Sequence, residues 1–157
     1  MSKSILRLMI PKSLVEYITL NCTIRQALEK MHFHRYTAIP VLDSGGKYAG
    51  TLRNDDIFDY FLKNGSFDKA MAESIPISEI LNPSYSKPVL HNTSIEVLIE
   101  NVKEHNFVAV VDDRGCFIGI VLRREVLNYL LEFFKEKIKI DIDECHKDTN
   151  LLAGEEK

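Results

Sequence analysis

The chain has 157 residues, 45% hydrophobic and 27% charged, with a formal net charge of −3. This composition is typical of a folded globular protein, and the negative net charge argues against binding nucleic acid through bulk electrostatics. No apolar run approaches the roughly 20 residues of a transmembrane helix, and the N-terminus lacks the apolar core of a signal peptide. Three cysteines without CxxC spacing predict neither a disulfide framework nor a zinc site. We expect a cytoplasmic protein.

The first half of the chain predicts strand, helix, hairpin and helix in that order. Residues 14–20 (LVEYITL) are the first strand candidate. Thr23 and Gln26 form a capping-box pattern at the start of the first helix. Two apolar runs around a glycine-containing turn after Asp43 predict the hairpin. The two helices have apolar positions at helical spacing, namely Ile24, Ala27, Leu28 and Met31, then Ile57, Phe61 and Leu62.

The second half repeats this order. Residues 87–90 (KPVL) are its first strand candidate, Thr93 and Glu96 again suggest a capping box, and a hairpin turn follows Asp112. A punctuated linker, residues 63–86, joins the halves. The apolar positions of the second pair of helices are Ile95, Leu98, Ile99 and Val102, then Val126, Leu130 and Leu131.

One phrase occurs twice, as GTLRNDDIFDYFL from Gly50 and as GIVLRREVLNYLL from Gly119, 69 positions apart. We therefore predict two β-α-β-β-α units that bury their sheets against each other. We expect Tyr60 and Tyr129, which match each other, to be packing residues. Met31 to Asp43 spans 12 positions but Val102 to Asp112 only 10, which predicts a tighter second helix–strand turn. The expected divisions are residues 5–65 (first repeat), 66–137 (linker and second repeat) and 138–157 (a polar, flexible tail).

The repeated segments resemble those of a tandem pair of cystathionine-β-synthase (CBS) repeats, a Bateman module. The similarity rests on a strand of the form AIPVLD and on the glycine phrase, found at residues 38–43 and 50–56 and again at 108–112 and 119–125. The resemblance implies an α+β fold in which two β-α-β-β-α CBS repeats pack sheet to sheet as a pseudo-symmetric pair. It also implies a regulatory module, not an enzyme, that binds an adenine nucleotide in a cleft between the repeats.

A closer similarity is to the stand-alone CBS-pair proteins of Gram-positive bacteria that bind cyclic di-AMP. It rests on Tyr36 and Thr37 before the AIPVLD strand, and on Arg123 and Arg124 at the second closing helix. The resemblance implies cyclic di-AMP as the ligand, a homodimer, and an unidentified target protein that receives the signal. The implied ligand-binding residues are Val15, Glu16, Tyr17, Tyr36, Thr37, Ala38, Arg123 and Arg124.

The chemistry of these residues suits a nucleotide. A helix start carries partial positive charge and unsatisfied N–H groups, which favour a phosphate. Arg123 and Arg124 would add charge-assisted hydrogen bonds; the alternative is that they are solvated or paired with Glu125. Tyr36 could stack an adenine or lie half-buried in a turn.

The first closing helix begins with Asn54, Asp55 and Asp56, which suit its own dipole, so we expect one competent phosphate cleft per chain. Candidates for a second cleft are Arg53, Asp56 and Phe107.

Three features leave other functions open. The family's Ser/Thr position is Arg53 in one repeat and Leu122 in the other, and Glu16 places an acid near the expected ligand. One alternative is therefore an AMP- or ATP-binding energy sensor, and another is a ligand-free CBS dimerisation and interaction scaffold. Four aromatic residues of the closing helices are compatible with dimerisation or with an internal core, namely Phe58, Phe61, Phe133 and Phe134.

No pattern predicts catalysis, a metal or a cofactor. His32 and His34 lie two positions apart, so they point to different sides of a helix. Asp141 and Asp143 lack the glycine and glutamate that complete a calcium loop. There is no phosphate-binding glycine loop or nucleophile elbow. No set of nucleophile, base and oxyanion donors can be assembled from the motifs.

Overall fold

A computed structural model describes residues 4–152, with side chains for residues 4–139. The architecture is α+β, with two small sheets and helices, as the sequence predicts. The first sheet has the order β2-β3-β4, with β2 (Ile18–Thr19), β3 (Ala38–Leu42) and β4 (Tyr48–Arg53). The second has the order β1-β7-β6-β5, with β1 (Met9–Pro11), β7 (Phe117–Leu122), β6 (Phe107–Val111) and β5 (Val89–Leu90). The helices are α1 (Ile24–His34), α2 (Asn54–Asn64), α3 (Lys69–Ser74), α4 (Ile95–Glu104) and α5 (Arg123–Leu152).

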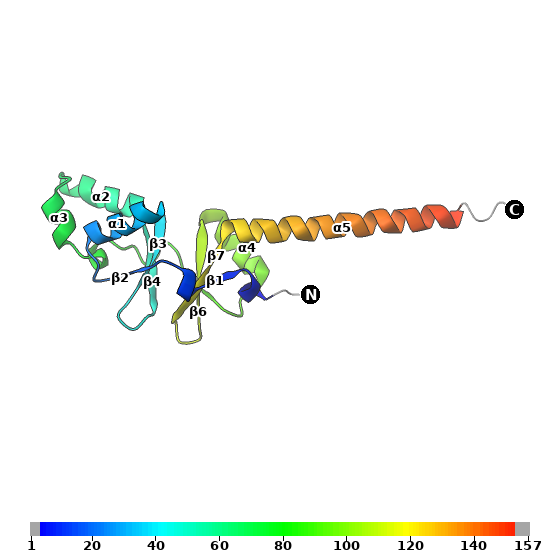
Figure 1. Cartoon of the computed structure of the whole chain (residues 1–157), viewed down its shortest axis with the longest axis horizontal. Coiled ribbons are helices and arrows are strands. Elements are labelled where there is room, and N and C mark those ends of the chain that lie inside the picture. Colours follow the sequence, from blue (N-terminus) through cyan, green and yellow to red (C-terminus); the bar gives the residue numbers. More distant parts are fainter. Residues whose placement is uncertain (1–3, 153–157) are drawn as a thin grey trace.

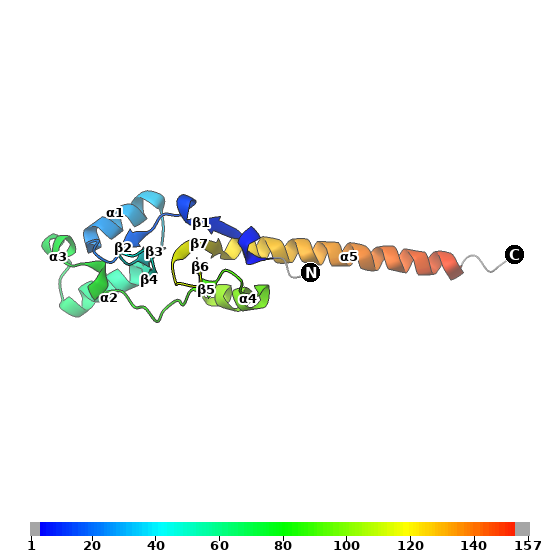
Figure 2. The ribbon, with the colours of Figure 1, turned by 90° about the horizontal axis from the view of Figure 1, so that it is seen from below.

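The two repeats are built alike and lie side by side (Figures 1 and 2). In each, a two-residue strand runs parallel to the first strand of an antiparallel hairpin. Ile18 pairs with Val41 in the first repeat, and Val89 pairs with Val110 in the second. The hairpins, β3–β4 and β6–β7, are the two that the repeated phrase predicts.

The two sheets pack against each other through an apolar layer that draws on both hairpins. Leu42 from the first repeat is buried there with Phe107 and Phe117 from the second. The hairpin tips also exchange backbone hydrogen bonds: the N–H of Phe117 donates to Gly46 at 3.0 Å, and the N–H of Tyr48 donates to Gly115 at 3.3 Å. Gly46 and Gly115 both have φ of 80°, a conformation that glycine adopts without strain. The pseudo-symmetric, sheet-to-sheet pair is confirmed.

Each repeat also has a core of its own, where helices cover the outer face of the sheet. Most of the predicted apolar helix positions are buried, but Ile99 and Leu130 are only partly buried, and Leu28, Leu62 and Leu131 are exposed. Tyr60 and Tyr129 pack against these cores, one in each repeat. The first core includes Ile24, Ala27, Met31, Ile39, Leu52, Ile57 and Phe61, and the second includes Ile95, Leu98, Val102, Val108, Val121 and Val126.

Only one of the two predicted capping boxes forms. Thr23 accepts from the N–H of Gln26 at 3.3 Å, and the Gln26 side chain accepts from the N–H of Thr23 at 3.0 Å. The prediction for Thr93 is wrong, because α4 begins one residue later and Ser94 is its N-cap. Of the two-residue difference between the repeats, one residue lies in the longer α1 and one in the turn after it, so the helix starts do not follow the 69-residue spacing of the hairpins.

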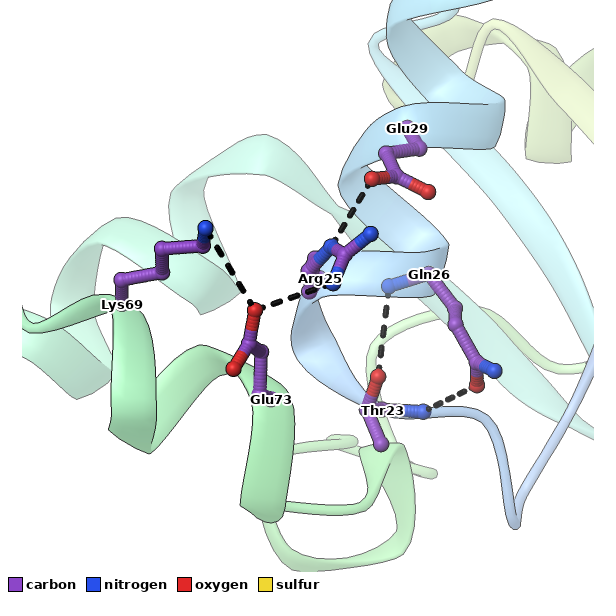
Figure 3. A network of polar contacts seen from close by, with 6 residues as sticks. All are labelled: Thr23, Arg25, Gln26, Glu29, Lys69 and Glu73. Carbon is purple, nitrogen blue, oxygen red and sulfur yellow. Dashed lines mark hydrogen bonds and ion pairs between the residues drawn. The ribbon is translucent and has the colours of Figure 1, made fainter.

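The segments that precede the repeats are exchanged between them. Ile5 is buried in the core of the second repeat, and β1 pairs with β7. The linker does the reverse, because Ile77 and α3 pack onto the first repeat. At the surface, Arg25 of α1 donates to Glu73 of α3 at 2.9 Å, and Lys69 lies 3.8 Å from the same carboxylate (Figure 3). The sequence did not predict β1 or this exchange.

The two closing helices differ in length. α2 stops at Gly65, which caps it with a left-handed φ of 66°, whereas α5 has 30 residues and extends away from the sheets (Figure 1). α5 runs through residues 138–152, most of the segment predicted to be a flexible tail, and no glycine or proline interrupts the chain between Gly119 and Gly154; residues 153–157 lie outside the described part. In the described chain, no helix is long and apolar enough to cross a membrane.

Candidate ligand-binding cleft

A cleft of about 400 Å³ lies where the two repeats meet. The first repeat contributes the segment after β1 and the turn between α1 and β3. The second contributes the ends of β6 and β7 and the start of α5. The cleft is lined by Ile10, Leu14, Val15, Glu16, Arg35, Tyr36, Thr37, Ala38, Pro40, Asn106, Phe107, Ile120, Leu122 and Arg124. Its floor is therefore apolar, and its charged groups come from three separate segments.

The turn between α1 and β3 forms one wall of the cleft. Arg35 ends α1 with φ of 56° and ψ of 40°, and the N–H of Tyr36 then donates to Met31 at 2.8 Å. The carbonyl of Thr37 accepts the N–H of Asn54, which anchors the turn to the start of α2. Tyr36 is 40% exposed and its ring stacks on His34, with centroids 5.2 Å apart. The turn therefore holds an accessible aromatic ring at the cleft.

The paired arginines at the start of α5 have different environments. Arg124 lines the cleft and is paired with Glu125 at 3.1 Å, although its side chain is 74% exposed. Arg123 does not line the cleft. Its side chain donates to the carbonyl of His105 at 3.2 Å, and its N–H donates to Asn106 at 2.9 Å. We conclude that Arg124 faces the space available to a ligand, whereas Arg123 connects the start of α5 to the turn between α4 and β6 by hydrogen bonds.

Glu16 lines the cleft with its charge already compensated. Its carboxylate lies 2.7 Å from the ammonium of Lys30 and 4.0 Å from His34. The hydrogen bond from Lys30, together with its positive charge, lowers the pKa of Glu16 below the usual value. Glu16 is therefore ionised at neutral pH, and Lys30 offsets much of the repulsion that an acidic wall would exert on an anionic ligand.

The structure brings most of the predicted binding residues together. Val15, Glu16, Tyr36, Thr37, Ala38 and Arg124 line one cleft, but Tyr17 and Arg123 are not among the residues that line it. Tyr17 instead packs in the layer between the sheets, edge-on to Phe117. The sequence analysis did not predict Arg35 or Leu14 as cleft residues. Arg35 directly precedes Tyr36, in the helix–strand turn that the sequence predicts to be the longer of the two. The sequence analysis also missed Ile10, because β1 was not predicted.

The same architecture is found in known proteins. The CBS domain profile matches residues 5–63 and 74–132. The chain belongs to the CBS domain family. The two matched segments coincide with the two structural repeats, and each includes the segment that packs onto the other repeat.

Individual CBS proteins resemble the chain at modest identity. The uncharacterized protein MJ1225 of Methanocaldococcus jannaschii is 28% identical over 132 residues; the match covers 76% of this chain and 46% of the relative, so the chain spans about half that protein's length. A hypothetical conserved protein from Geobacillus kaustophilus has a TM-score of 0.77 at 27% identity, covering 84% of this chain and 98% of the other. The CbpB protein of Listeria monocytogenes, solved in complex with c-di-AMP, has a TM-score of 0.73 at 25% identity, covering 83% and 97%.

The pseudo-symmetry of the CBS pair defines a second position equivalent to the cleft. The pairing of Ala38 with Arg53 matches that of Phe107 with Leu122, so Arg53 is the counterpart of Leu122. Two residues further along, Asp55 is the counterpart of Arg124. The second position therefore has an acid where the first has an arginine, which disfavours a phosphate.

Side chains meet one another around this second position. The guanidinium of Arg53 lies 3.9 Å from the ring centre of Tyr85, whose edge contacts His105 at 4.8 Å. The same guanidinium bonds the buried carboxylate of Asp56 at 3.2 Å through Nε, and this bond raises the pKa of Arg53. Arg53 and Asp56 also border an outer hollow of about 340 Å³, whereas Phe107 lines the first cleft. The three candidates for a second cleft are thus not brought together.

The described side chains offer little for metal chemistry. Among residues 4–139, no three His, Cys, Asp or Glu side chains gather as a metal site would require. Cys22 and Cys116 are free and half-buried, one beside the first core and one at the hairpin contact. Asp141, Asp143 and Cys145 lie outside the part of the chain with described side chains.

Proposed function

We propose that this CBS pair is a ligand-sensing regulatory module that binds an adenine nucleotide, with cyclic di-AMP the favoured ligand. The observation that carries the proposal is the placement of Arg124, at the start of α5, in the same cleft as the accessible ring of Tyr36. One group can bind a phosphate and the other a base. The complex of the similar CbpB protein with c-di-AMP supports the choice of ligand.

Each part of the cleft has a role in this proposal. The adenine stacks on Tyr36 and packs against the apolar floor formed by Pro40, Ile120 and Leu122. The phosphate lies at the start of α5, where the helix dipole and Arg124 favour negative charge. To bind it, Arg124 exchanges its exposed pair with Glu125, which contributes little by itself. Residues 15–16 and 37–38 line the remaining walls.

We propose one occupied cleft per chain. The second position has Asp55 in place of Arg124, and its Arg53 is paired with Asp56 and lies against Tyr85. A ligand there would have to displace a buried ion pair, which is costly.

We also propose that the chain acts as a homodimer and passes ligand occupancy to a target protein. Support for the dimer comes from α5, where Leu127, Leu131, Phe134 and Ile138 are 51%, 57%, 57% and 57% exposed. Their spacing of four, three and four positions puts them on one helix face. Occupancy of the cleft can alter this dimer surface only if the ligand favours one conformation of the module. α5 connects the two, because its first turn carries Arg124 and its later turns carry the exposed apolar residues.

The first test is titration calorimetry and thermal unfolding with cyclic di-AMP, AMP, ATP and S-adenosylmethionine in parallel. At 100 times its dissociation constant, a ligand should raise the unfolding midpoint by about 5–10 °C. We expect cyclic di-AMP to bind most tightly, with one site per chain. Tighter binding of AMP or ATP would replace the proposal with an energy sensor. No binding of any of the four would favour the ligand-free scaffold.

The two arginines provide a matched pair of variants. Arg124→Ala should weaken cyclic di-AMP binding about tenfold or more, the equivalent of one charged hydrogen bond. Arg123→Ala removes the same charge from the same helix turn, but its side chain holds His105 and not the ligand, so affinity should change less than about threefold. Equal losses in both variants would contradict a direct contact from Arg124.

A further inference from the structure

Arg35 has a backbone conformation that disfavours its own side chain. Its φ of 56° and ψ of 40° are left-handed, and it is the only non-glycine residue with positive φ in the described chain. Glycine adopts this conformation freely, whereas most other residues are strained in it. Arginine does not favour the left-handed conformation as asparagine and aspartate do, although its positive charge is favoured at a helix C-terminus. The residue is therefore better explained by what its side chain reaches.

The guanidinium of Arg35 is available for a ligand. Arg35 is one of the residues that line the cleft, and among the described residues no hydrogen bond or ion pair occupies its guanidinium. The acid that shares the cleft, Glu16, is paired with Lys30 and His34. Arg35 also borders an adjoining hollow of about 390 Å³ on the outer side of the same turn, beside His32 and Asn54. Arg35, which has no ion-pair partner among the described residues, therefore borders both the cleft and the adjoining hollow.

Two unrelated segments therefore present a guanidinium to one cleft. Arg124 comes from the helix start of the second repeat, and Arg35 from the turn of the first, with the apolar residues Ala38 and Phe107 among those that line the space they share. At Arg124 the positive end of the α5 dipole also favours a phosphate, whereas Arg35 lies at the C-terminal end of α1, where its positive charge is favoured even without a ligand. This arginine is specific to one cleft, because at the 69-residue spacing of the hairpins the position of Arg35 is taken by Glu104 in the second repeat.

We propose that Arg35 is a second phosphate contact, so that the cleft selects a ligand with two phosphate groups over a nucleoside monophosphate. This inference rests on the proposed function. It assigns a specificity-determining role to a residue outside the motif that predicted the site. The strained backbone of Arg35 is then retained because the position serves binding more than stability.

Two variants at this position separate the side chain from the backbone. Arg35→Ala removes the guanidinium and keeps the left-handed strain, whereas Arg35→Gly removes both. We expect each to weaken cyclic di-AMP binding about tenfold and AMP binding less than about threefold, by calorimetry on the full chain. Without ligand, Arg35→Gly should unfold a few degrees higher than Arg35→Ala, because glycine relieves the strain. Arg35→Lys should keep part of the affinity.

The outcomes are distinct. If the wild-type chain binds cyclic di-AMP and Arg35→Ala binds it equally well, the role of Arg35 is overturned while the proposed function stands. A loss in Arg35→Gly alone would overturn it too, since the backbone and not the guanidinium would then matter. Equal losses for AMP and cyclic di-AMP would contradict selection between them. If the wild-type chain binds neither nucleotide, the proposed function fails, and this inference fails with it.

Discussion

At the scale of single residues, the cleft is defined by how its charges are paired. Glu16 looks unfavourable for an anionic ligand, yet the ammonium of Lys30 lies 2.7 Å from its carboxylate. Arg123 and Arg124 look equivalent, yet one bonds a carbonyl and the other faces the cleft. Neighbours distant in sequence thus decide which charge a ligand would meet.

The partial compensation of Glu16 leads to a prediction. Glu16→Gln removes the carboxylate beside Lys30, which keeps its hydrogen bond to the carbonyl of Tyr17. The cleft wall thereby gains one unit of positive charge, so cyclic di-AMP should bind about two- to fivefold more tightly at low salt. The gain should shrink in 0.5 M salt, where exposed charges are screened more strongly. Calorimetry at two salt concentrations measures both effects.

A suitable control is Glu29→Gln, on α1 next to Lys30. Glu29 pairs with Arg25 at 2.9 Å outside the cleft, so its loss should change affinity little. Weaker binding by Glu16→Gln would mean that the carboxylate accepts a hydrogen bond from the ligand itself.

At the scale of secondary-structure elements, β1 links the N-terminal segment to the cleft. It pairs with β7, with Pro11 opposite Gly119, and its Ile10 lines the cleft. The approach is close: a Cβ at Gly119 would lie 2.3 Å from the carbonyl oxygen of Ile10. The glycine of the second repeated phrase is therefore required by the contact between two strands.

Gly119→Ala should displace β1 from the sheet. Overpacking of this kind costs about 1–3 kcal/mol. Because the obstructing atom belongs to the backbone, we expect the free energy of unfolding to fall by about 3 kcal/mol. Chemical denaturation measures it, and nucleotide affinity should fall as well because Ile10 moves.

Gly45→Ala is the matched control. Gly45 lies in a hairpin turn, and the atom nearest to its added Cβ would be Asp43 Oδ1 at an ordinary 3.4 Å. Its stability should change by less than about 0.5 kcal/mol. If both variants lose the same stability, the β1 contact is not the cause.

At the scale of the whole molecule, the two repeats cannot be regarded as independent domains. Ile5 completes the second core, Ile77 completes the first, and the hairpin tips hold each other. α5 is the exception, because it leaves this unit and carries an exposed apolar stripe (Figures 1 and 2). Its charge is uneven by sequence, because residues 123–139 have five basic and three acidic residues, whereas residues 140–152 have four acidic residues and one lysine.

This charge pattern suits a second copy of α5 in antiparallel orientation, because the acidic part of one helix would then face the basic part of the other. The double variant Leu131→Gln/Phe134→Gln should convert a dimer to a monomer while nucleotide binding is retained. Analytical ultracentrifugation at several concentrations measures the change, and raising the salt should weaken the wild-type dimer.

Leu62→Gln serves as the control for this pair. Leu62 is also exposed, at 54%, but it lies on α2, so the dimer should persist. A wild-type chain that is monomeric at high micromolar concentration would refute the dimer, and a double variant that still dimerises would place the interface elsewhere.

The sequence by itself determined the repeat, the hairpins and the order of the elements within each repeat, and six of the fourteen residues that line the cleft were among the predicted binding residues. These features are local: apolar spacing sets each helix, and turn residues set each hairpin. The similarity of Tyr36, Thr37 and Arg124 to residues of known CBS pairs then indicated one cleft.

Only the tertiary structure decided which partners the charged groups have and where the flanking segments go. The pairing of β1 with β7 and of Glu16 with Lys30 depends on chain segments that meet only after folding. The backbone strain at Arg35 could not be predicted either, because the sequence does not show which φ an arginine after a helix adopts. The length of α5 was missed because polar composition suggested a tail, although no residue before Gly154 breaks the helix. Local patterns report local structure, whereas a binding site depends on contacts between segments distant in sequence.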